Sequence, residues 1–205
     1  MEYKVIYGEY LDSSYVGDKL YAIDCAVYEE KYWGVPENMV ARFERNKKSF
    51  VVIEDTPGHP VGYIGFLLTG DALWNDIIKD GDTIRDDDIR PDELLDKFEG
   101  DDNKLFVISV VILPDHRGRE AVSILTDGFI DYLNKIQEED NCKITAITGT
   151  AVSEDGQKFL KRLNFRFYRE VGDLGDNPED KDIVFLCDGD GIKRLLDHEL
   201  NLKKK

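Results

Sequence analysis

Residues Pro114 to Val122 combine basic side chains with the residue types of a tight turn, as anion-binding loops do. Arg117 and Arg119 flank Gly118, shortly after an apolar run that ends at the proline. If a helix begins here, its first backbone N–H groups lack partners within the helix, and its dipole favours negative charge at that end. Two guanidinium groups beside such amides are predicted to bind a phosphate or pyrophosphate group.

The flanking sequence predicts a strand before this loop and a helix after it. Leu105 to Leu113 is apolar except for Ser109 and is rich in β-branched residues, which is typical of a strand buried on both faces. From Glu120 onward, apolar residues recur every three or four positions, as they do in an amphipathic helix. The basic loop is therefore predicted to join a buried strand to a helix N-terminus.

This unit resembles the acetyl-CoA loop of the GNAT superfamily of N-acetyltransferases. Pro114 and the Arg117-Gly118 pair match the family pattern V-x-P-x-x-R/Q-G-x-G-x-G/A, whereas Glu120 and Val122 replace residues that are usually small. The resemblance implies that acetyl-CoA is a co-substrate and that no metal is needed. The residues it places at the cofactor are Val111, Ile112, Leu113, Arg117, Gly118, Arg119, Glu120, Ala121, Val122 and Ser153.

Ser153 to Phe165 resembles a second pattern of the family, N-x-x-A-x-x-L-Y-x-x-L-G-F. The spacing and the apolar types agree, but Leu160 stands in place of the tyrosine and Asn164 in place of the glycine. In the family this tyrosine commonly protonates the leaving thiolate, and a leucine has no proton to give. Two alternatives follow: CoA leaves as a thiolate, or Tyr168 on the next predicted strand supplies the proton.

The order of predicted elements matches the superfamily from about Tyr3 to Cys187. The fold class is α/β (an α+β mixed sheet), a GNAT-like acyl-CoA acyltransferase fold with a central mixed sheet flanked by helices. The absence of repeats and linkers predicts one domain over residues 1–205. The predicted strands are Glu2–Tyr10, Ser49–Glu54, Val61–Leu68, Leu105–Leu113, Lys143–Val152, Phe165–Val171 and Asp182–Cys187. The predicted helices run from Asp12 to Trp33, from Pro36 to Arg45, and after Glu120, Ser153 and Asp190.

An acidic insertion is predicted at about residues 71–104, between two core strands. Residues 71–102 hold thirteen Asp and Glu residues against four Lys and Arg residues. One interpretation is a solvated excursion, and the other is a lid that supplies acidic contacts to a cationic acceptor. Within it, Pro91 to Phe98 is predicted to form a short helix with Leu94, Leu95 and Phe98 facing inward.

The resemblance also implies a mechanism. In the superfamily the pantetheine arm lies between two parallel strands that part, here Leu105–Leu113 and Lys143–Val152. The acceptor amine attacks the thioester directly, after losing a proton, since a free alkylamine has a pKa near ~10.4. A carboxylate or a water chain acts as the base, and a backbone N–H near Val110 or Val111 polarises the thioester oxygen.

Few residues can be assigned to the acceptor side from the sequence. Ser109 is the candidate that would face the opening and pass a proton through water, although a strand serine is also a common hydrogen-bonded core residue. His116 sits at a loop tip and is expected to face solvent. Residues at positions that line the acceptor pocket in the family are Glu29, Glu30, Tyr32 and Trp33.

Composition narrows the partners and the compartment. A formal charge of −16 argues against nucleic acid and anionic membrane, and it permits a cationic small-molecule or peptide amine. Three cysteines far apart indicate neither a disulfide framework nor a zinc site and fit the reducing cytoplasm. Residues 1–10 lack the layout of a signal peptide, and no apolar run reaches the length of a membrane span. The sequence leaves a homodimer open.

Three function classes remain. The first is an N-acetyltransferase that moves an acetyl group from acetyl-CoA to an amine. The alternative is a catalytically degenerate module of the same fold that binds an acyl-CoA or a protein, which the departures at Glu120, Val122 and Leu160 favour. The third, a structural acidic partner of a basic protein, rests on charge alone.

Overall fold

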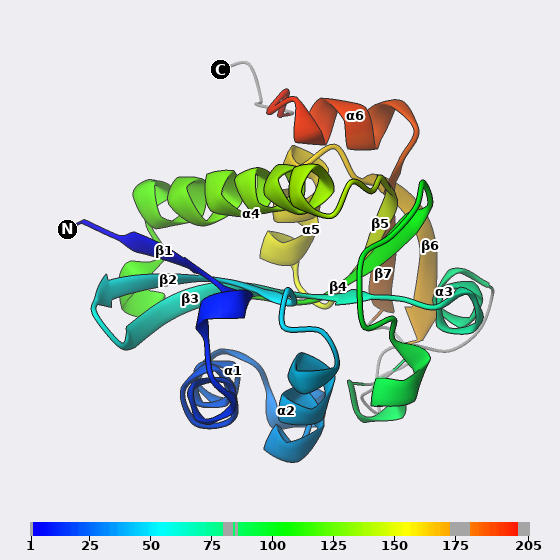
Figure 1. Ribbon diagram of the computed structural model, residues 1–205. Coiled ribbons are helices and arrows are strands. Elements are labelled where there is room, and N and C mark those ends of the chain that lie inside the picture. Colours follow the sequence, from blue (N-terminus) through cyan, green and yellow to red (C-terminus); the bar gives the residue numbers. More distant parts are fainter. Residues whose placement is uncertain (1, 80–83, 85, 173–180, 201–205) are drawn as a thin grey trace.

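A seven-stranded mixed sheet forms the centre of the computed structural model, which describes residues 2–79, 84, 86–172 and 181–200. Its strand order is β1-β2-β3-β4-β5-β7-β6, and among these neighbours only β4 and β5 run parallel. Strands β5, β7 and β6 turn steeply away from the direction of β1 to β3, as the twist of a wide sheet requires (Figure 1). The strands are β1 (Lys4–Tyr7), β2 (Phe50–Thr56), β3 (His59–Leu68), β4 (Asn103–Ile112), β5 (Ile144–Ala151), β6 (Arg166–Gly172) and β7 (Lys181–Asp188).

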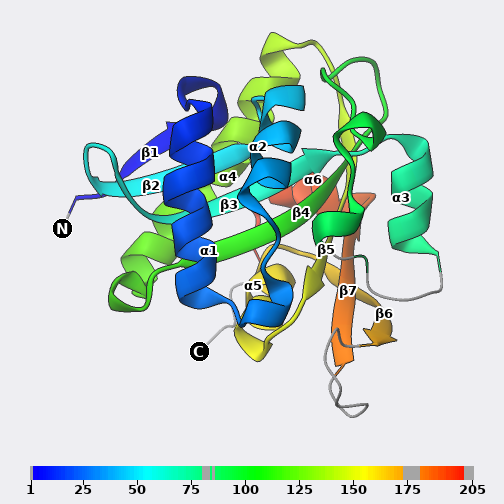
Figure 2. The same ribbon diagram turned by 90° about the horizontal axis from the view of Figure 1, so that it is seen from below.

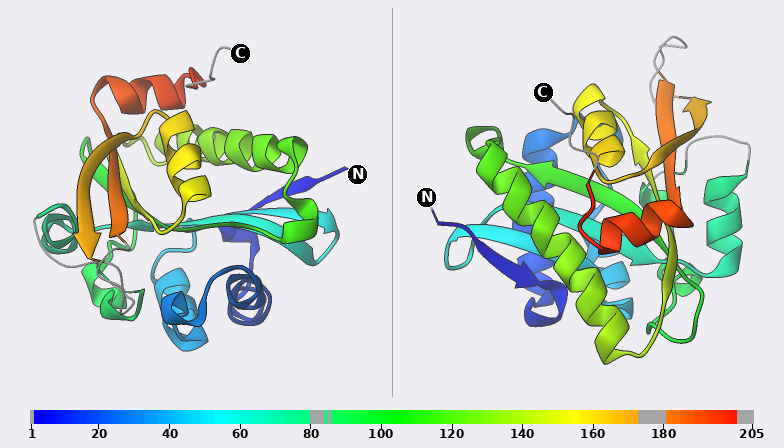
Figure 3. Two further views of the ribbon diagram at one scale, coloured as in Figure 1. Left: turned by 180° about the vertical axis from the view of Figure 1, so that it is seen from behind. Right: turned by 90° about the horizontal axis from the view of Figure 1, so that it is seen from above.

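Helices cover both faces of the sheet. One face carries α1 and α2, which lie across the strands in Figure 2, and the other carries α4, α5 and α6 (Figure 3). Helix α3 lies at the side of the molecule. The mixed sheet flanked by helices confirms the predicted fold class. The helices are α1 (Tyr21–Val27, continuing a π-helical stretch Tyr15–Leu20), α2 (Pro36–Arg45), α3 (Asp71–Ile78), α4 (Arg119–Glu139), α5 (Glu154–Arg162) and α6 (Asp190–Leu196).

The apolar strands have buried residues on both faces, because successive side chains point to opposite sides of a sheet. On β2, Val51 and Ile53 belong to the core beneath α4, whereas Phe50 and Val52 belong to the core beneath α1 and α2. Two separate cores therefore hold the sheet in place. This double burial explains why the strands read as continuous apolar runs in the sequence.

One helix end differs from the sequence prediction and another agrees with it. The first helix ends at Val27 rather than near Trp33, because Tyr28 adopts an extended conformation and a separate 3₁₀ turn follows at Glu30–Tyr32. The predicted left-handed residue after α5 is confirmed, since Asn164 has φ of 65°.

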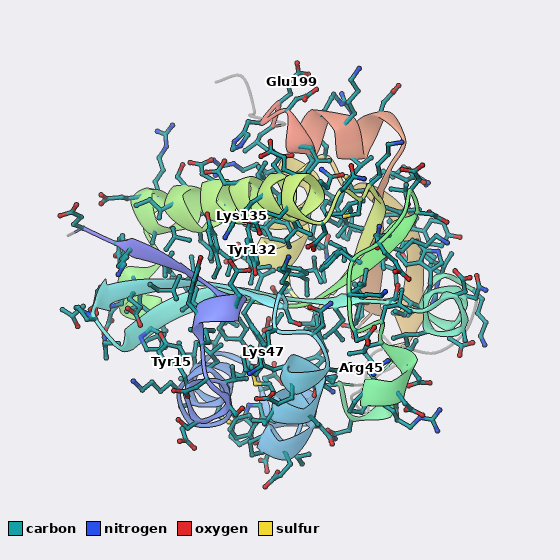
Figure 4. The ribbon with its side chains drawn as sticks, in the orientation of Figure 1. Tyr15, Arg45, Lys47, Tyr132, Lys135 and Glu199 are labelled. Atoms are coloured by element: carbon teal, nitrogen blue, oxygen red, sulfur yellow. The ribbon has the colours of Figure 1, made fainter. Side chains whose placement is uncertain are left out.

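Strand β1 is short and lies at the edge of the sheet, and an aromatic cluster ties it to α4. The rings of Tyr7 and Tyr132 stack with centroids 4.2 Å apart. The Lys135 ammonium lies over both rings and over Tyr10, and it pairs with Glu9. Figure 4 shows Tyr132 and Lys135 pointing from α4 toward this edge. These contacts hold a strand too short to be stable by its own pairing.

The segment between β3 and β4 packs against the rest of the protein, so its interpretation as a solvated excursion is wrong. It builds a third core with β3 and β4, and anchors to α2 through Arg42. The Arg42 guanidinium is almost fully buried, and its Nη2 donates to both Asp86 carboxylate oxygens at 2.7 Å. Residues 80–83 and 85 of this segment lie outside the described residues. The buried residues of the third core are Leu67, Leu73, Ile77, Ile89, Leu94 and Phe106.

The predicted helix at Pro91–Phe98 is wrong. Only a 3₁₀ turn forms, at Pro91–Glu93, where the Glu93 carboxylate accepts from the Arg90 N–H at 2.8 Å. Leu94 then extends to bridge Thr69, and this leaves Leu95 42% exposed rather than facing inward.

None of the helices in the described part of the chain has both the length and the apolar character that crossing a membrane requires.

Candidate functional site

Strands β4 and β5 part in the middle of the sheet. Their parallel pairing runs from Asn103 with Ile144 to Val107 with Gly149 and goes no further. Beyond that point β4 stays paired with β3 as far as Ile112, and β5 stays paired with β7. Each strand therefore has one unpaired edge facing the other across an opening, as the sequence predicted for these two strands.

A bulge in β4 marks the start of the opening. Gly65 of β3 pairs with Ser109 and the next residue, Phe66, pairs with Val107, so Ile108 is an extra residue in the ladder. The consecutive side chains of Ile108 and Ser109 consequently line the same cavity instead of pointing to opposite faces. The bulge aims the predicted candidate Ser109 toward α1.

The cavity at this bulge has a volume of about 100 Å³ and lies between α1, the insertion and the two parting strands. It forms where the core beneath α1 and α2 meets the core of the insertion. Apolar walls come from Phe106 and Ile108, among others. The polar residues that line it are Asp24, Tyr28, Tyr32, Asp86, Ser109 and Thr150.

Tyr28 occupies the free edge of β4. Its hydroxyl donates to the Val110 carbonyl and accepts from the Val110 N–H, each at 3.3 Å. The Tyr28 carbonyl in turn accepts from the Trp33 indole at 2.9 Å, which fixes the turn after α1. Burial raises the pKa of Tyr28 to about 12, so its hydroxyl keeps its proton at neutral pH.

Asp24 lies one turn before Tyr28 on the same face of α1. One of its carboxylate oxygens accepts from the Ser109 hydroxyl at 3.1 Å. Burial raises the pKa of Asp24 to about 6, against the lowering effect of the Tyr63 and Ser109 hydroxyls. The carboxylate is therefore ionised at neutral pH, although pH 7 is only about one pH unit above its pKa.

The basic loop follows β4 directly. Helix α4 starts at Arg119 with Gly118 as its N-cap, and no side chain caps it. Arg117 donates from Nε to the Ile112 carbonyl at 3.0 Å, and its remaining guanidinium nitrogens lie on an exposed side chain. Arg119 and Glu120 are also exposed, so the Glu120 carboxylate is free to point away from the helix N-terminus. The loop thus has the uncapped amides and the positive charge that an anion needs.

No protein-family model matches the sequence, and no curated protein does either. Solved structures do match over nearly the whole chain. The loading GNATL domain of CurA from Lyngbya majuscula has a TM-score of 0.66 at 12% identity and covers 92% of this chain and 98% of that one. The GphF GNAT-like decarboxylase in complex with isobutyryl-CoA has a TM-score of 0.64 at 10% identity, covering 89% and 97%. Arabidopsis thaliana NAA60 in complex with acetyl-CoA has a TM-score of 0.55 at 13% identity, covering 92% and 100%.

The chain has the GNAT fold. The resemblance drawn from the sequence motifs is confirmed at the level of the fold. At identities of 10–13%, this likeness shows the fold alone.

Within this GNAT fold, the backbone groups that face the opening belong to Val110 and Ile112. Leu113 donates its N–H to Val61 of β3, and the Val111 side chain is buried in the core beneath α1 and α2. Of the two N–H groups predicted as candidates, the one turned toward the opening is that of Val110. The Leu113 N–H and the Val111 side chain are therefore not available to a ligand in the opening.

The cavity lining does not include four residues that were named from the sequence: Tyr168, Ser153, Leu160 and His116. Tyr168 is on the outer strand β6, separated from β5 by β7, and it does not line the cavity; the Arg166 guanidinium lies 5.8 Å from its ring. Ser153 caps α5, accepting from the Gly156 N–H at 3.1 Å. Leu160 is buried and supplies no proton. His116 does not face solvent as expected, because its Nδ1 lies 3.2 Å from the Tyr3 hydroxyl.

Of the four pocket positions taken from the family, one lines the cavity. The Tyr32 side chain does so, and its hydroxyl donates to Asp182 at 3.4 Å. Trp33 supports the turn after α1, and Glu29 and Glu30 are exposed.

Sequence reasoning identified neither Asp24 nor Tyr28 as a site residue. A signal was present, because Leu20, Asp24 and Tyr28 are spaced four residues apart and share one face of a helix. A carboxylate between two inward-facing residues needs a partner or a function. Among the described residues there is no group of His, Cys, Asp and Glu side chains that could hold a metal ion.

Proposed function

We propose that this protein is an acyl-CoA-dependent N-acetyltransferase that moves an acetyl group directly from acetyl-CoA to the nitrogen of a cationic amine. One observation carries the proposal. The opening between β4 and β5 presents the Val110 backbone between a basic helix N-terminus and an acidic cavity. An anionic donor and a cationic acceptor would meet at that backbone.

The donor side supports this function through charge and free backbone groups. The CoA pyrophosphate would bind the uncapped N-terminus of α4 beside Arg117 and Arg119. Its pantetheine arm would then follow the unpaired edge of β4, with the thioester oxygen at the Val110 N–H. The Tyr28 hydroxyl, which holds that N–H at 3.3 Å, would move aside. A fixed N–H at this place would stabilise the charge that develops on the oxygen during attack.

The acceptor side supports an amine. The ionisable side chains that line the cavity are acids and tyrosines, with Asp24 and Asp86 as its carboxylates. Similar structures include Arabidopsis thaliana NAA60 with a bisubstrate analogue and a NatC complex bound to a Gag peptide and CoA. The amine of this protein's substrate therefore belongs to a small molecule or to a peptide, with the ammonium group in the cavity.

A second candidate is a module that binds acyl-CoA and transfers nothing. The observation that favours it is the buried Leu160 on α5, which leaves that helix without a proton donor. Decarboxylation, the activity in the name of the similar GphF GNAT-like decarboxylase, is disfavoured. A substrate carboxylate would meet Asp24 and Asp86 and be repelled.

Calorimetry and a thiol-release assay test the proposal together. Acetyl-CoA should bind, and Arg117→Ala should weaken binding about 10- to 100-fold, since a hydrogen bond to a charged group contributes about 1.5–3 kcal/mol. Arg194→Ala, which removes an exposed arginine on α6, is the matched control and should leave affinity unchanged.

The wild-type protein should also release CoA when amines are added, with the N-acetylated amine identified by mass spectrometry. Binding without release for any amine between pH 6 and 10 would contradict transfer and favour the binding module. If acetyl-CoA fails to bind, both candidates are wrong.

A further inference from the structure

The acceptor side of the opening holds a carboxylate that has no ion-pair partner among the described residues. We propose that Asp24 is the general base of the transfer, taking a proton from the ammonium group of the acceptor. This assignment rests on the proposed function. It concerns a residue outside both sequence motifs, on the helix that covers the opposite face from α4.

The position of Asp24 fits this role. Asp24 lines the cavity at the bulge and also an adjoining smaller cavity of about 30 Å³ toward Phe43 and Tyr63. The Ser109 hydroxyl donates to it at 3.1 Å, and Ser109 immediately precedes Val110 in β4. The base and the N–H that would polarise the thioester are therefore tied together through consecutive residues of one rigid strand.

The second carboxylate of the cavity is already engaged. Both oxygens of Asp86 accept from Arg42 Nη2 at 2.7 Å, and its carbonyl accepts from Nη1 at 2.7 Å. A proton on Asp86 would have to displace this buried guanidinium. Asp24 accepts a hydrogen bond from the neutral Ser109 hydroxyl and has no ion pair among the described residues, so its carboxylate can accept a proton without breaking one.

The groups around Asp24 set its affinity for a proton. Tyr21 and Tyr28 face it from its own helix, Arg42 from α2, Tyr63 from β3 and Asp86 from the insertion. Burial and the Asp86 charge raise the pKa of Asp24, whereas Arg42 and the hydroxyls of Tyr63 and Ser109 lower it. The resulting pKa of about 6 is closer to neutrality than that of a free carboxylate and suits a general base.

One base is enough to account for every proton in the transfer. The ammonium nitrogen loses its first proton to Asp24, and the freed electron pair attacks the thioester carbonyl carbon. The tetrahedral intermediate collapses with cleavage of the C–S bond, whose electron pair leaves on sulfur. The second proton lost from nitrogen ends on the CoA thiolate, the third stays on the amide, and Asp24 releases its proton to solvent.

Asp24→Asn tests the assignment, because the amide keeps an oxygen for the Ser109 hydroxyl but cannot act as a base. At pH 7 we expect kcat/KM for the amine to fall about 10²–10³-fold, within the range of a positioned base. The acetyl-CoA dissociation constant should stay within about twofold. In the wild type, kcat/KM should rise with pH up to about 6 and then level. In the variant this rise below pH 6 should vanish. Its kcat/KM should instead increase with pH in proportion to the fraction of unprotonated amine, up to the pKa of the amine at about 10.4.

Asp18→Asn is the matched control, since Asp18 is exposed on the helical stretch that leads into α1. It should keep the wild-type rate and pH profile. Ser109→Ala tests whether Ser109 positions the carboxylate. Loss of its hydrogen bond to Asp24 should move the rise of kcat/KM to higher pH, which a loss of packing alone would not do.

Two results would overturn the assignment of Asp24. The first is a wild-type profile that is flat from pH 5 to 8 at saturating acetyl-CoA, which needs no variant to fold. The second is an Asp24→Asn enzyme that keeps the wild-type profile while the protein turns over. A wild-type protein that binds no acetyl-CoA, or acetylates no amine, would instead overturn the proposed function and this assignment with it.

Discussion

On one side of the β4–β5 opening the chain carries exposed arginines, and on the other side half-buried carboxylates. The loop that begins α4 presents Arg117 and Arg119 to solvent beside uncapped amides. The cavity under α1 holds Asp24 and Asp86 against apolar walls. The two regions share one structural element, since both border the unpaired edge of β4.

This difference shows how a strongly acidic protein could hold an anionic co-substrate. A formal charge of −16 would repel CoA on average, so the positive charge has to be local, and it lies where the helix dipole adds to it. The acidic side is less open to solvent, so its charges are less screened by water and salt. We expect the two substrates to be sorted by charge, each to its own side of the same strand.

The largest effect on the acidic side should be a gain in stability when its free carboxylate is neutralised. The pKa of Asp24 in the folded protein, about 6, lies above the ordinary value of about 3.9. Between these values the folded state binds more protons than the unfolded state, so this group makes stability fall as pH rises. Asp24→Asn should therefore raise the unfolding free energy at pH 7 by about 1–3 kcal/mol.

Urea unfolding from pH 3.5 to 8 measures this difference. The gain of Asp24→Asn over the wild type should be fully developed above about pH 6 and should vanish below about pH 4, where both side chains are neutral. A constant difference at every pH would show that the effect is one of packing. A variant less stable than the wild type at pH 7 would show that the Asp24 charge is well compensated.

A smaller effect is expected where the two sides meet. Tyr28→Phe removes the hydroxyl that holds the Val110 N–H, so acetyl-CoA would no longer compete for it. Since a neutral hydrogen bond contributes about 0.5–1.5 kcal/mol net, acetyl-CoA should bind about two- to tenfold more tightly. Tyr10→Phe, at a 70% exposed site near β1, is the control for loss of a phenol. Weaker binding in Tyr28→Phe would place the hydroxyl in contact with the bound thioester instead.

The architecture could be predicted from the sequence because each core strand and long helix has a clear hydrophobic period. The run Leu105–Leu113 and the stripe after Glu120 fix the strand, loop and helix of the donor side. The acceptor side could be predicted only in part. Ser109 was identified by being the one polar residue in an apolar strand, but the bulge that aims it at α1 depends on pairing with β3.

The rest of the acceptor side depends on contacts between distant segments. Asp24 meets Ser109 across 85 positions of sequence, and Asp86 meets Arg42 across 44, so no local pattern reports either contact. The interpretation of the insertion as a solvated excursion was wrong for the same reason, because its many acidic residues outnumber the apolar residues that form the third core. Tyr168 was one of two alternatives for the leaving thiolate because it is the phenol nearest to Leu160 in sequence, whereas in space a phenol at the opening is that of Tyr28.

The most direct test of selection by charge compares kcat/KM for three acceptors that have the same four-carbon chain and a similar amine but differ in their second charge. We predict that kcat/KM falls in the order 1,4-diaminobutane, butylamine, 4-aminobutanoate, with about a tenfold loss at the last step. That loss equals roughly 1.4 kcal/mol, the scale of one nearby like charge near a protein surface. The differences should shrink as salt rises from ~0.01 to ~0.5 M. If 4-aminobutanoate is acetylated as efficiently as the diamine at low salt, the acidic cavity does not select the acceptor, and the account is contradicted.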